Sequence, residues 1–125
     1  MFDCKKILGG RINVPETEVH KVGGTAITAG MALTLSGGVL VKATGAPTHI
    51  ALADAAANTK VACYAVLPGM IFDVPVSVTP SAKEGDKVTL GADGLTVTST
   101  TTNGVATIVN LNGATKAGDI IQVKF

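Results

Sequence analysis

Turn-forming residues divide most of the chain into short segments, and this feature limits the possible folds more than any other. The sequence contains 15 glycines and 5 prolines, with Gly-Gly or Asn-Gly pairs between short apolar runs. Such pairs favour tight hairpin turns because Gly and Asn reach positive φ angles with little strain. Only residues 51–57, which are rich in alanine, have a helical composition, and they are too few to form an apolar stripe. We therefore predict an all-β fold, with a loop of at most one helical turn at 51–57.

Alternating apolar residues predict the individual strands. Met31, Leu33 and Leu35 recur at every second position, so they share one face of a strand. A Gly-Gly turn then reverses the chain and residues 39–42 return, which is the pattern of a β-hairpin. We expect this hairpin to form part of a small antiparallel β-barrel or sandwich, of the β-tulip or β-clip type.

The C-terminal third predicts an antiparallel meander. Four alternating segments, at residues 87–90, 95–99, 105–111 and 120–125, are separated by Gly-containing turns. Strands joined by such short turns pair with their neighbours. From the hairpin and the meander together we expect one continuous buried face, made of Leu33, Leu35, Val88, Leu90, Val97, Val109, Ile121 and Val123.

The charge of the chain restricts its partners. Ten Lys and Arg residues oppose nine Asp and Glu residues, so the chain lacks the basic surface of a nucleic-acid-binding protein. Charged residues make up 15% of the sequence, against about 25% in ordinary domains, while hydrophobic residues make up 46%. We interpret this uncharged surface as one that other chains partly cover, and we expect a homo-oligomer.

Neither membrane insertion nor export is expected. The most apolar stretch, residues 61–78, is interrupted by two prolines, a glycine and an aspartate, so it cannot be a spanning helix. Lys5 and Lys6 are not followed by the apolar segment of a signal peptide. Cys4 and Cys63 form no CxxC pair, and we expect reduced thiols, with synthesis in the cytoplasm and no membrane partner.

The sequence offers little for catalysis, metal binding or cofactor binding. His20 and His49 are isolated histidines in strand-like segments, and Cys63 lies in an apolar run, so all three are interpreted as structural. There is no His-x-x-x-His, no paired cysteine, no calcium loop and no phosphate-binding glycine motif. We predict a non-enzyme with no catalytic, cofactor or metal residues.

Residues 1–18 are predicted to form an extended arm, followed by a single β domain at 19–125. The arm combines apolar anchors with cations around a Gly-Gly hinge, and we expect residues 1–11 to pack on another subunit, either a different protein or a neighbouring protomer, rather than on their own barrel. The alternatives are a frayed terminus and an ordinary first strand. The candidate contact residues are Phe2, Lys5, Lys6, Ile7, Leu8 and Arg11.

Four segments in a fixed order resemble the decoration and head-fibre proteins of tailed-phage capsids. They are VGGTAITAGMALTLSGGVLVKATG, APTHIALADAAANTKVACYAVLPGMIFDVPV, AKEGDKVTLGADGLTVT and KAGDIIQVKF, and the opening MFDCKKILGGRINVPETEV resembles the base of the head-fibre branch. The resemblance spans about residues 5–125, and the order of the segments carries it. Met31, where Asp is commoner, and His49-Ile50, where Gly is usual, depart from the pattern in turns only.

The resemblance implies a structural virion protein. Members of this group sit as trimers or monomers on the outer capsid surface, where they reinforce the shell or carry a fibre. The implied partner is the major capsid protein, and the implied location is the exterior of a bacteriophage virion, with a homotrimer expected.

Two alternatives from other classes stay open. One is a small β-barrel binding module for a carbohydrate or a swinging-arm cofactor, although the hairpin tips lack the lysine that such an arm needs. Carbohydrate binding usually requires exposed aromatic side chains, and the chain has only four: Phe2, Tyr64, Phe72 and Phe125. The other alternative, a β-clip accessory domain of an enzyme, depends on residues 26–35 alone.

Overall fold

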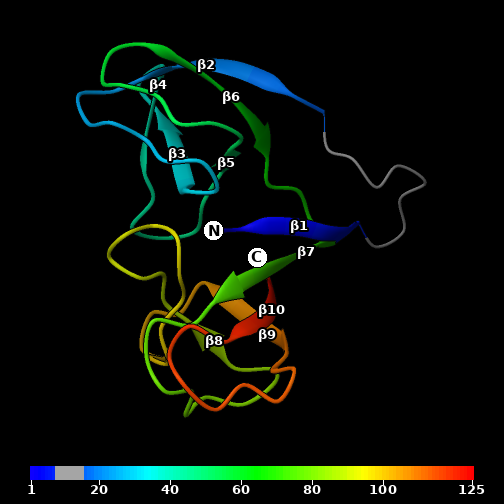
Figure 1. Ribbon diagram of the computed structural model, residues 1–125. Helices are drawn as coiled ribbons and strands as arrows, with labels where there is room; N and C mark the ends of the chain where they lie inside the picture. The colour runs from blue at the N-terminus through cyan, green and yellow to red at the C-terminus, as the bar shows by residue number, and fades with distance from the viewer. Residues whose placement is uncertain (8–15) are drawn as a thin grey trace.

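A computed structural model describes residues 1–7 and 16–125. Within these ranges the regular secondary structure consists of β-strands alone (Figure 1). The prediction of an all-β fold is confirmed, and residues 51–57 form no helix. Among the described residues there is no helix with the length and apolar character needed to cross a membrane. The strands are β1 (Asp3–Ile7), β2 (Glu18–Val22), β3 (Ala32–Ser36), β4 (Val39–Lys42), β5 (His49–Ala51), β6 (Lys60–Ala65), β7 (Met70–Pro75), β8 (Lys87–Val88), β9 (Ala106–Asn110) and β10 (Ile120–Lys124).

The strands form two sheets. One closes into a barrel in the order β2-β4-β3-β5-β6, and the other is open, in the order β1-β7-β10-β9-β8. Strands β1 and β7 lie between the barrel and the rest of the open sheet (Figure 1). The expected barrel is therefore present, but the sequence did not indicate that it would be joined to a separate sheet. It is also not wholly antiparallel, since β2 and β4 pair in parallel and thereby close the barrel.

The hairpin predicted from the Gly-Gly turn is confirmed. Strands β3 and β4 pair antiparallel with Ser36 opposite Val39, which leaves a two-residue turn. Gly37 and Gly38 have φ angles of 59° and 82°. Positive φ at both central residues matches the twist of the adjoining strands, and for this reason glycine suits the turn.

The predicted meander has three strands and not four: β8, β9 and β10 are neighbours in the sheet, but residues 95–99 form no strand, so β8 pairs directly with β9. Strand β9 pairs antiparallel with both β8 and β10. Strand β8 has only two residues, and beyond it the pairing reduces to an isolated bridge between Leu90 and Val97. The Asp93 carboxylate accepts hydrogen bonds from the Leu95 amide at 2.8 Å and the Thr96 hydroxyl at 2.9 Å. These side-chain bonds hold the turn where a strand ladder would otherwise continue.

The core consists of two clusters instead of the single continuous face we expected. Leu33 belongs to the barrel interior, whereas Val88, Val97, Ile121 and Val123 are buried in a second cluster under the open sheet. Leu35 and Leu90 are only partly buried, each at the margin of its cluster.

Val109 is 37% exposed, and its expected burial was wrong. On β10, Gln122 is opposite Asn110 and Val123 is opposite Ile108, so Val109 is the extra residue of a β-bulge. Ala106 and Ile108 are the buried positions of β9, so ordinary alternation directs Val109 outward, and the bulge comes only after Ile108.

All four aromatic side chains of the protein meet in the second cluster. Phe72, on β7, is completely buried at its centre. Its ring centroid lies 6.2 Å from that of Phe2, 5.6 Å from that of Phe125 and 6.5 Å from that of Tyr64. Because Tyr64 belongs to barrel strand β6, this aromatic cluster joins the barrel to the open sheet.

We expect Phe72→Ala to reduce the free energy of unfolding by about 3–5 kcal/mol, the usual effect of removing a fully buried phenyl group. Equilibrium unfolding in urea measures this change. Leu67→Ala is the control, since Leu67 is 54% exposed and its truncation should have almost no effect. Equal effects of the two substitutions would show that the aromatic cluster is not a main source of stability.

Candidate functional site

Four side chains that can bind a metal gather at one end of the barrel interior. Glu18 and His20 come from β2, His49 from β5 and Cys63 from β6, and their ligand atoms all lie within 4.8 Å of one another. The strand register explains this meeting. Cys63 is opposite Glu18 on one side and opposite Ala51 on the other. Since side chains two residues apart share a face, His20 and His49 point to the same side as Cys63.

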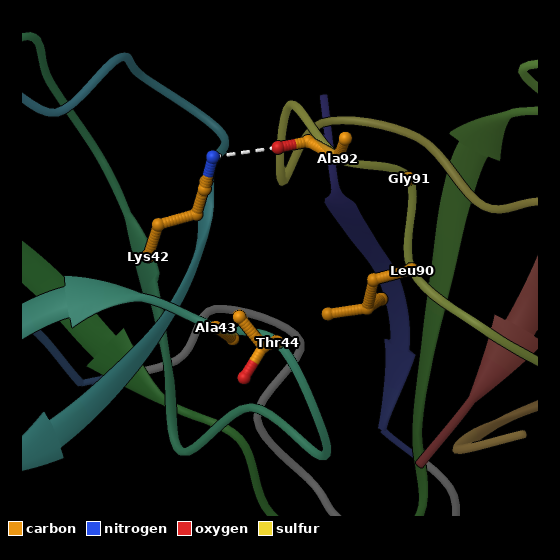
Figure 2. A pocket seen from close by; sticks show the side chains of 6 residues that line it. All are labelled: Lys42, Ala43, Thr44, Leu90, Gly91 and Ala92. Atoms are coloured by element: carbon orange, nitrogen blue, oxygen red, sulfur yellow. Dashed lines mark hydrogen bonds between the residues drawn. The ribbon is translucent and has the colours of Figure 1, made fainter. Parts of the chain in front are cut away.

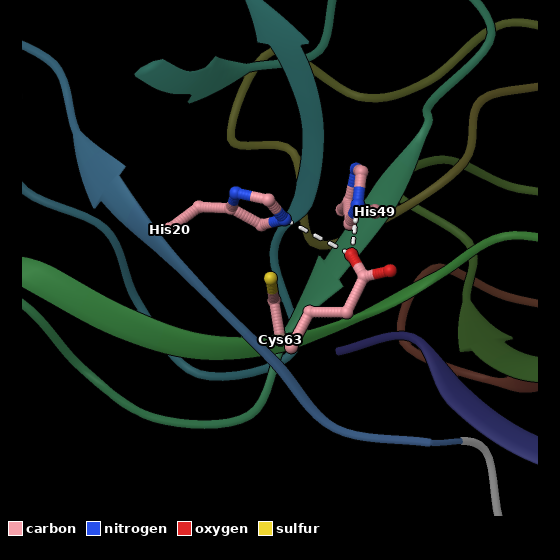
Figure 3. A group of neighbouring side chains, drawn as sticks. His20, His49 and Cys63 are labelled. Atoms are coloured by element: carbon pink, nitrogen blue, oxygen red, sulfur yellow. Dashed lines mark hydrogen bonds and ion pairs between the residues drawn. The ribbon is translucent and has the colours of Figure 1, made fainter. Parts of the chain in front are cut away.

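The Glu18 carboxylate connects the two histidines. Its Oε2 atom accepts a hydrogen bond from His20 Nε2 at 3.0 Å and another from His49 Nε2 at 2.7 Å. Figure 3 shows the two imidazoles converging on this oxygen, with the Cys63 thiol beside them. The hydrogen bonds from His20 and then from His49 lower the pKa of Glu18 below its ordinary value. Glu18 is thus an ionised acceptor at neutral pH.

His49 has a second hydrogen-bond partner on its other ring nitrogen. Its Nδ1 atom lies 2.9 Å from the Thr48 hydroxyl oxygen. That oxygen also accepts a hydrogen bond from the Leu35 amide at 2.8 Å, so the backbone of β3 fixes its position. Both nitrogens of His49 are therefore held in a defined orientation.

The Cys63 thiol is completely buried, as the sequence predicted. Burial, and then the negative charge of Glu18, raise its pKa to about 11. The thiol is consequently protonated at neutral pH, which makes it a poor nucleophile. Cys4 lies on β1, and neither cysteine is in a disulfide, as predicted.

The sequence did not reveal this cluster. His20 and His49 were interpreted as isolated structural histidines, but their rings are in edge-to-face contact with centroids 5.1 Å apart. Metal motifs in a sequence depend on ligands at short, fixed spacings. Here Glu18 and His49 are separated by 31 positions and are joined only by closure of the barrel. The one local signal was the alternation of Glu18 with His20 along a single strand.

A cleft of about 400 Å³ separates the barrel from the open sheet (Figure 2). Residues 42–44 line one side of it and residues 90–92 line the other. The Lys42 ammonium, the only charged group in this lining, donates a hydrogen bond across the cleft to the Ala92 carbonyl at 2.6 Å. The cleft is a junction between the two sheets that the Lys42 side chain bridges.

The predicted arm belongs in part to the domain itself. Strand β1 pairs antiparallel with β7, and Phe2 is buried in the aromatic cluster at 2% exposure. The Phe2 amide also donates a hydrogen bond to the Gly30 carbonyl at 2.9 Å. The expectation that residues 1–11 avoid their own domain was therefore wrong for residues 1–7, because β7 offers both a strand edge and an apolar cavity for Phe2. The alternative, an ordinary strand, is confirmed there.

The other predicted contact residues have different positions. Lys5 is exposed and forms a 2.6 Å surface ion pair with Asp3. Lys6 and Ile7 lie within β1. Leu8 and Arg11 lie outside the described residues. The predicted boundary between arm and domain, after residue 18, falls within β2.

We expect Phe2→Ala to reduce the free energy of unfolding by about 3 kcal/mol, because it removes a buried ring from the aromatic cluster. Lys5→Ala, in the same strand, should leave it almost unchanged, since an exposed ion pair adds little stability. Thermal and urea unfolding of both variants would test this. An unchanged free energy of unfolding in Phe2→Ala would instead support the hypothesis that the N-terminal arm does not pack on its own domain.

The burial of the aromatic residues also weakens the alternative of carbohydrate binding. Phe2, Tyr64 and Phe72 are each at most 5% exposed, so they present no platform for a sugar ring. Burial raises the pKa of Tyr64 well above its ordinary value, as expected for a phenol held in the core.

Comparison with solved structures shows that the fold of this chain is similar to that of a phage head-fibre base. The chain is similar to the crystal structure of the head fiber gp8.5 N base of bacteriophage phi29, with a TM-score of 0.59 and 20% sequence identity. The likeness covers 88% of this chain and 94% of the phi29 chain. No family model and no curated protein matches the sequence. The resemblance to head-fibre proteins is thus confirmed at the level of the fold.

Proposed function

We propose that this protein is a structural component of a phage virion, a head-fibre base or decoration protein that binds the outer surface of the capsid. Its partner is the major capsid protein, and its role is to reinforce the shell or to carry a fibre. The observation that supports this most strongly is the fold shared with the phi29 head-fibre base along nearly the full length of both chains. The order of sequence segments supports it independently, and no enzymatic activity is part of the proposal.

The surface composition fits a protein that packs against other chains. Only 15% of its residues are charged. Several large apolar side chains are exposed on both sheets, and Val19 on β2 is the most exposed of them at 62%. Exposed apolar area of this kind favours contacts between subunits. The resemblance to capsid decoration and head-fibre proteins implies a trimer, and we propose a homotrimer as the assembled form.

The oligomer is tested by sedimentation velocity on the purified chain. We expect a trimer at micromolar concentration. Its subunit interface should bury at least about 1,000 Å² in total, the area that specific association needs. A folded protein that remains monomeric at high micromolar concentration would contradict the trimer, although a monomer could still bind the capsid.

Capsid binding is tested by cosedimentation with empty capsids of the phage that encodes the chain. The association rate is followed by time-resolved light scattering of the same mixture. Reversing three N-terminal cations, by Lys5→Glu, Lys6→Glu and Arg11→Glu together, should slow association several-fold at low salt. The reason is that cations facing an acidic surface affect the association rate more than the final affinity.

The matched control reverses three cations of the open-sheet region, Lys83, Lys87 and Lys116, all exposed. It changes the net charge equally, so any general electrostatic effect appears in both triple variants. Equal association rates for the two variants would show that residues 5–11 are not part of the contact with the capsid. If the unaltered protein fails to sediment with capsids, the proposed function is overturned.

A further inference from the structure

We propose that Glu18, His20, His49 and Cys63 form a binding site for one zinc-type divalent ion, which fastens strand β2 to strands β5 and β6. This inference goes beyond the proposed virion role and does not depend on it. It depends on the convergence of four ligand groups from three strands of the barrel, whose ligand atoms all lie within 4.8 Å of one another.

The chemistry of the ligand atoms selects the kind of ion. Two imidazole nitrogens, one sulfur and one carboxylate oxygen form a set typical of Zn²⁺ and of its spectroscopic substitute Co²⁺. The Cys63 thiol, which is protonated without the ion, would release its proton to solvent when it binds as a thiolate. Mg²⁺ and Ca²⁺ require ligand shells made of oxygen, which this cluster does not provide. Four protein ligands also fill a tetrahedral shell completely, which is characteristic of a structural site and not of a catalytic one.

The observed distances are close to those of a tetrahedral site. Metal–ligand bonds of about 2.0–2.3 Å place the ligand atoms of a tetrahedron about 3.3–3.8 Å apart. In this structure Glu18 Oε2 lies 3.0 Å from His20 Nε2 and 2.7 Å from His49 Nε2. The two imidazoles already aim at one point, which the carboxylate oxygen now occupies. A shift of that carboxylate by about an ångström would make room for an ion.

The exposure of the four groups permits this shift and gives the ion access. The Glu18 side chain is 43% exposed and that of His20 is 30% exposed, so both can adjust their rotamers. The His49 side chain is 10% exposed and Cys63 is fully buried, so these two form the rigid inner half of the site. An ion would approach from solvent past Glu18.

A second interaction supports His49 as a ligand. When a histidine binds a metal through one ring nitrogen, the other nitrogen usually donates its hydrogen to a fixed acceptor, and this fixes the ring orientation. The Thr48 hydroxyl oxygen lies 2.9 Å from His49 Nδ1 and is itself held by the Leu35 amide. With Nε2 on the ion, Nδ1–H would donate to this oxygen.

The first experiment titrates the full chain, treated with a chelator under reducing conditions, with Co²⁺ and then with Zn²⁺. We expect one equivalent of Co²⁺ per chain, with the intense visible bands of tetrahedral cobalt and a near-ultraviolet cobalt–thiolate charge-transfer band, both abolished by Zn²⁺. Zn²⁺ should also raise the melting temperature, since an ion that binds only the folded state stabilises it. Mg²⁺ at the same concentration should do neither.

The second experiment assigns the ligands. Cys63→Ala should abolish the cobalt–thiolate band, whereas Cys4→Ala, which removes the other thiol, should leave the band and the affinity unchanged. His20→Gln should weaken Zn²⁺ binding by about tenfold or more, and because His20 is partly exposed this variant is expected to fold even if Cys63→Ala does not.

Three results would overturn the site. They are Zn²⁺ binding no tighter than millimolar, binding of several equivalents without saturation, and a cobalt–thiolate band that survives Cys63→Ala. Each can occur whether or not the protein sediments with capsids, so failure of the metal site is distinguishable from failure of the proposed virion function.

Discussion

The packing of aromatic rings around Phe72 is the interaction on which the rest of the structure depends. Only four residues of the chain are aromatic, and all four are concentrated at the junction of the two sheets. Tyr64 enters from the barrel, Phe72 from the open sheet, and Phe2 and Phe125 from the segments before β1 and after β10. Aromatic pairs with centroids 4.5–7 Å apart add stability beyond the area they bury. The junction therefore makes one folding unit of the barrel and the sheet.

Closure of the barrel is the second constraint, and the candidate metal site is its consequence. The parallel pairing of β2 with β4 and the antiparallel pairing of β2 with β6 leave β2 no freedom of register. Glu18 and His20 are thereby brought over the same end of the barrel as His49 and Cys63. The polar cluster closes an otherwise apolar interior, and the Glu18 carboxylate satisfies both histidines through hydrogen bonds. A structural role on a capsid and a metal that strengthens the barrel are compatible, because both concern mechanical stability and neither requires a catalytic group.

Local signals in the sequence were reliable where short-range geometry decides the structure. The Gly37-Gly38 hairpin was correctly predicted because a two-residue turn restricts its own φ angles and those of few other residues. The prediction that Val109 faces the core was wrong because alternation alone does not decide which set of β9 residues, Ala106 and Ile108 or Thr107 and Val109, points inward. The prediction that Phe2 packs on another subunit was wrong for a related reason. Apolar residues beside cations are equally compatible with a docking arm and with an edge strand, and only the presence of β7 distinguishes them.

The sequence by itself determined the class of fold, the Gly37-Gly38 hairpin, five of the eight residues that it predicted to be buried, and the resemblance to head-fibre proteins. These features depend on turn residues and on period-two alternation, which are properties of neighbouring positions. Only the tertiary structure decided that the barrel closes through a parallel pair, that residues 1–7 join the open sheet, and that two separated histidines share one carboxylate. The physical reason is that each of these features is a contact between distant segments, and such contacts are set by barrel closure and core packing instead of by local conformational preference.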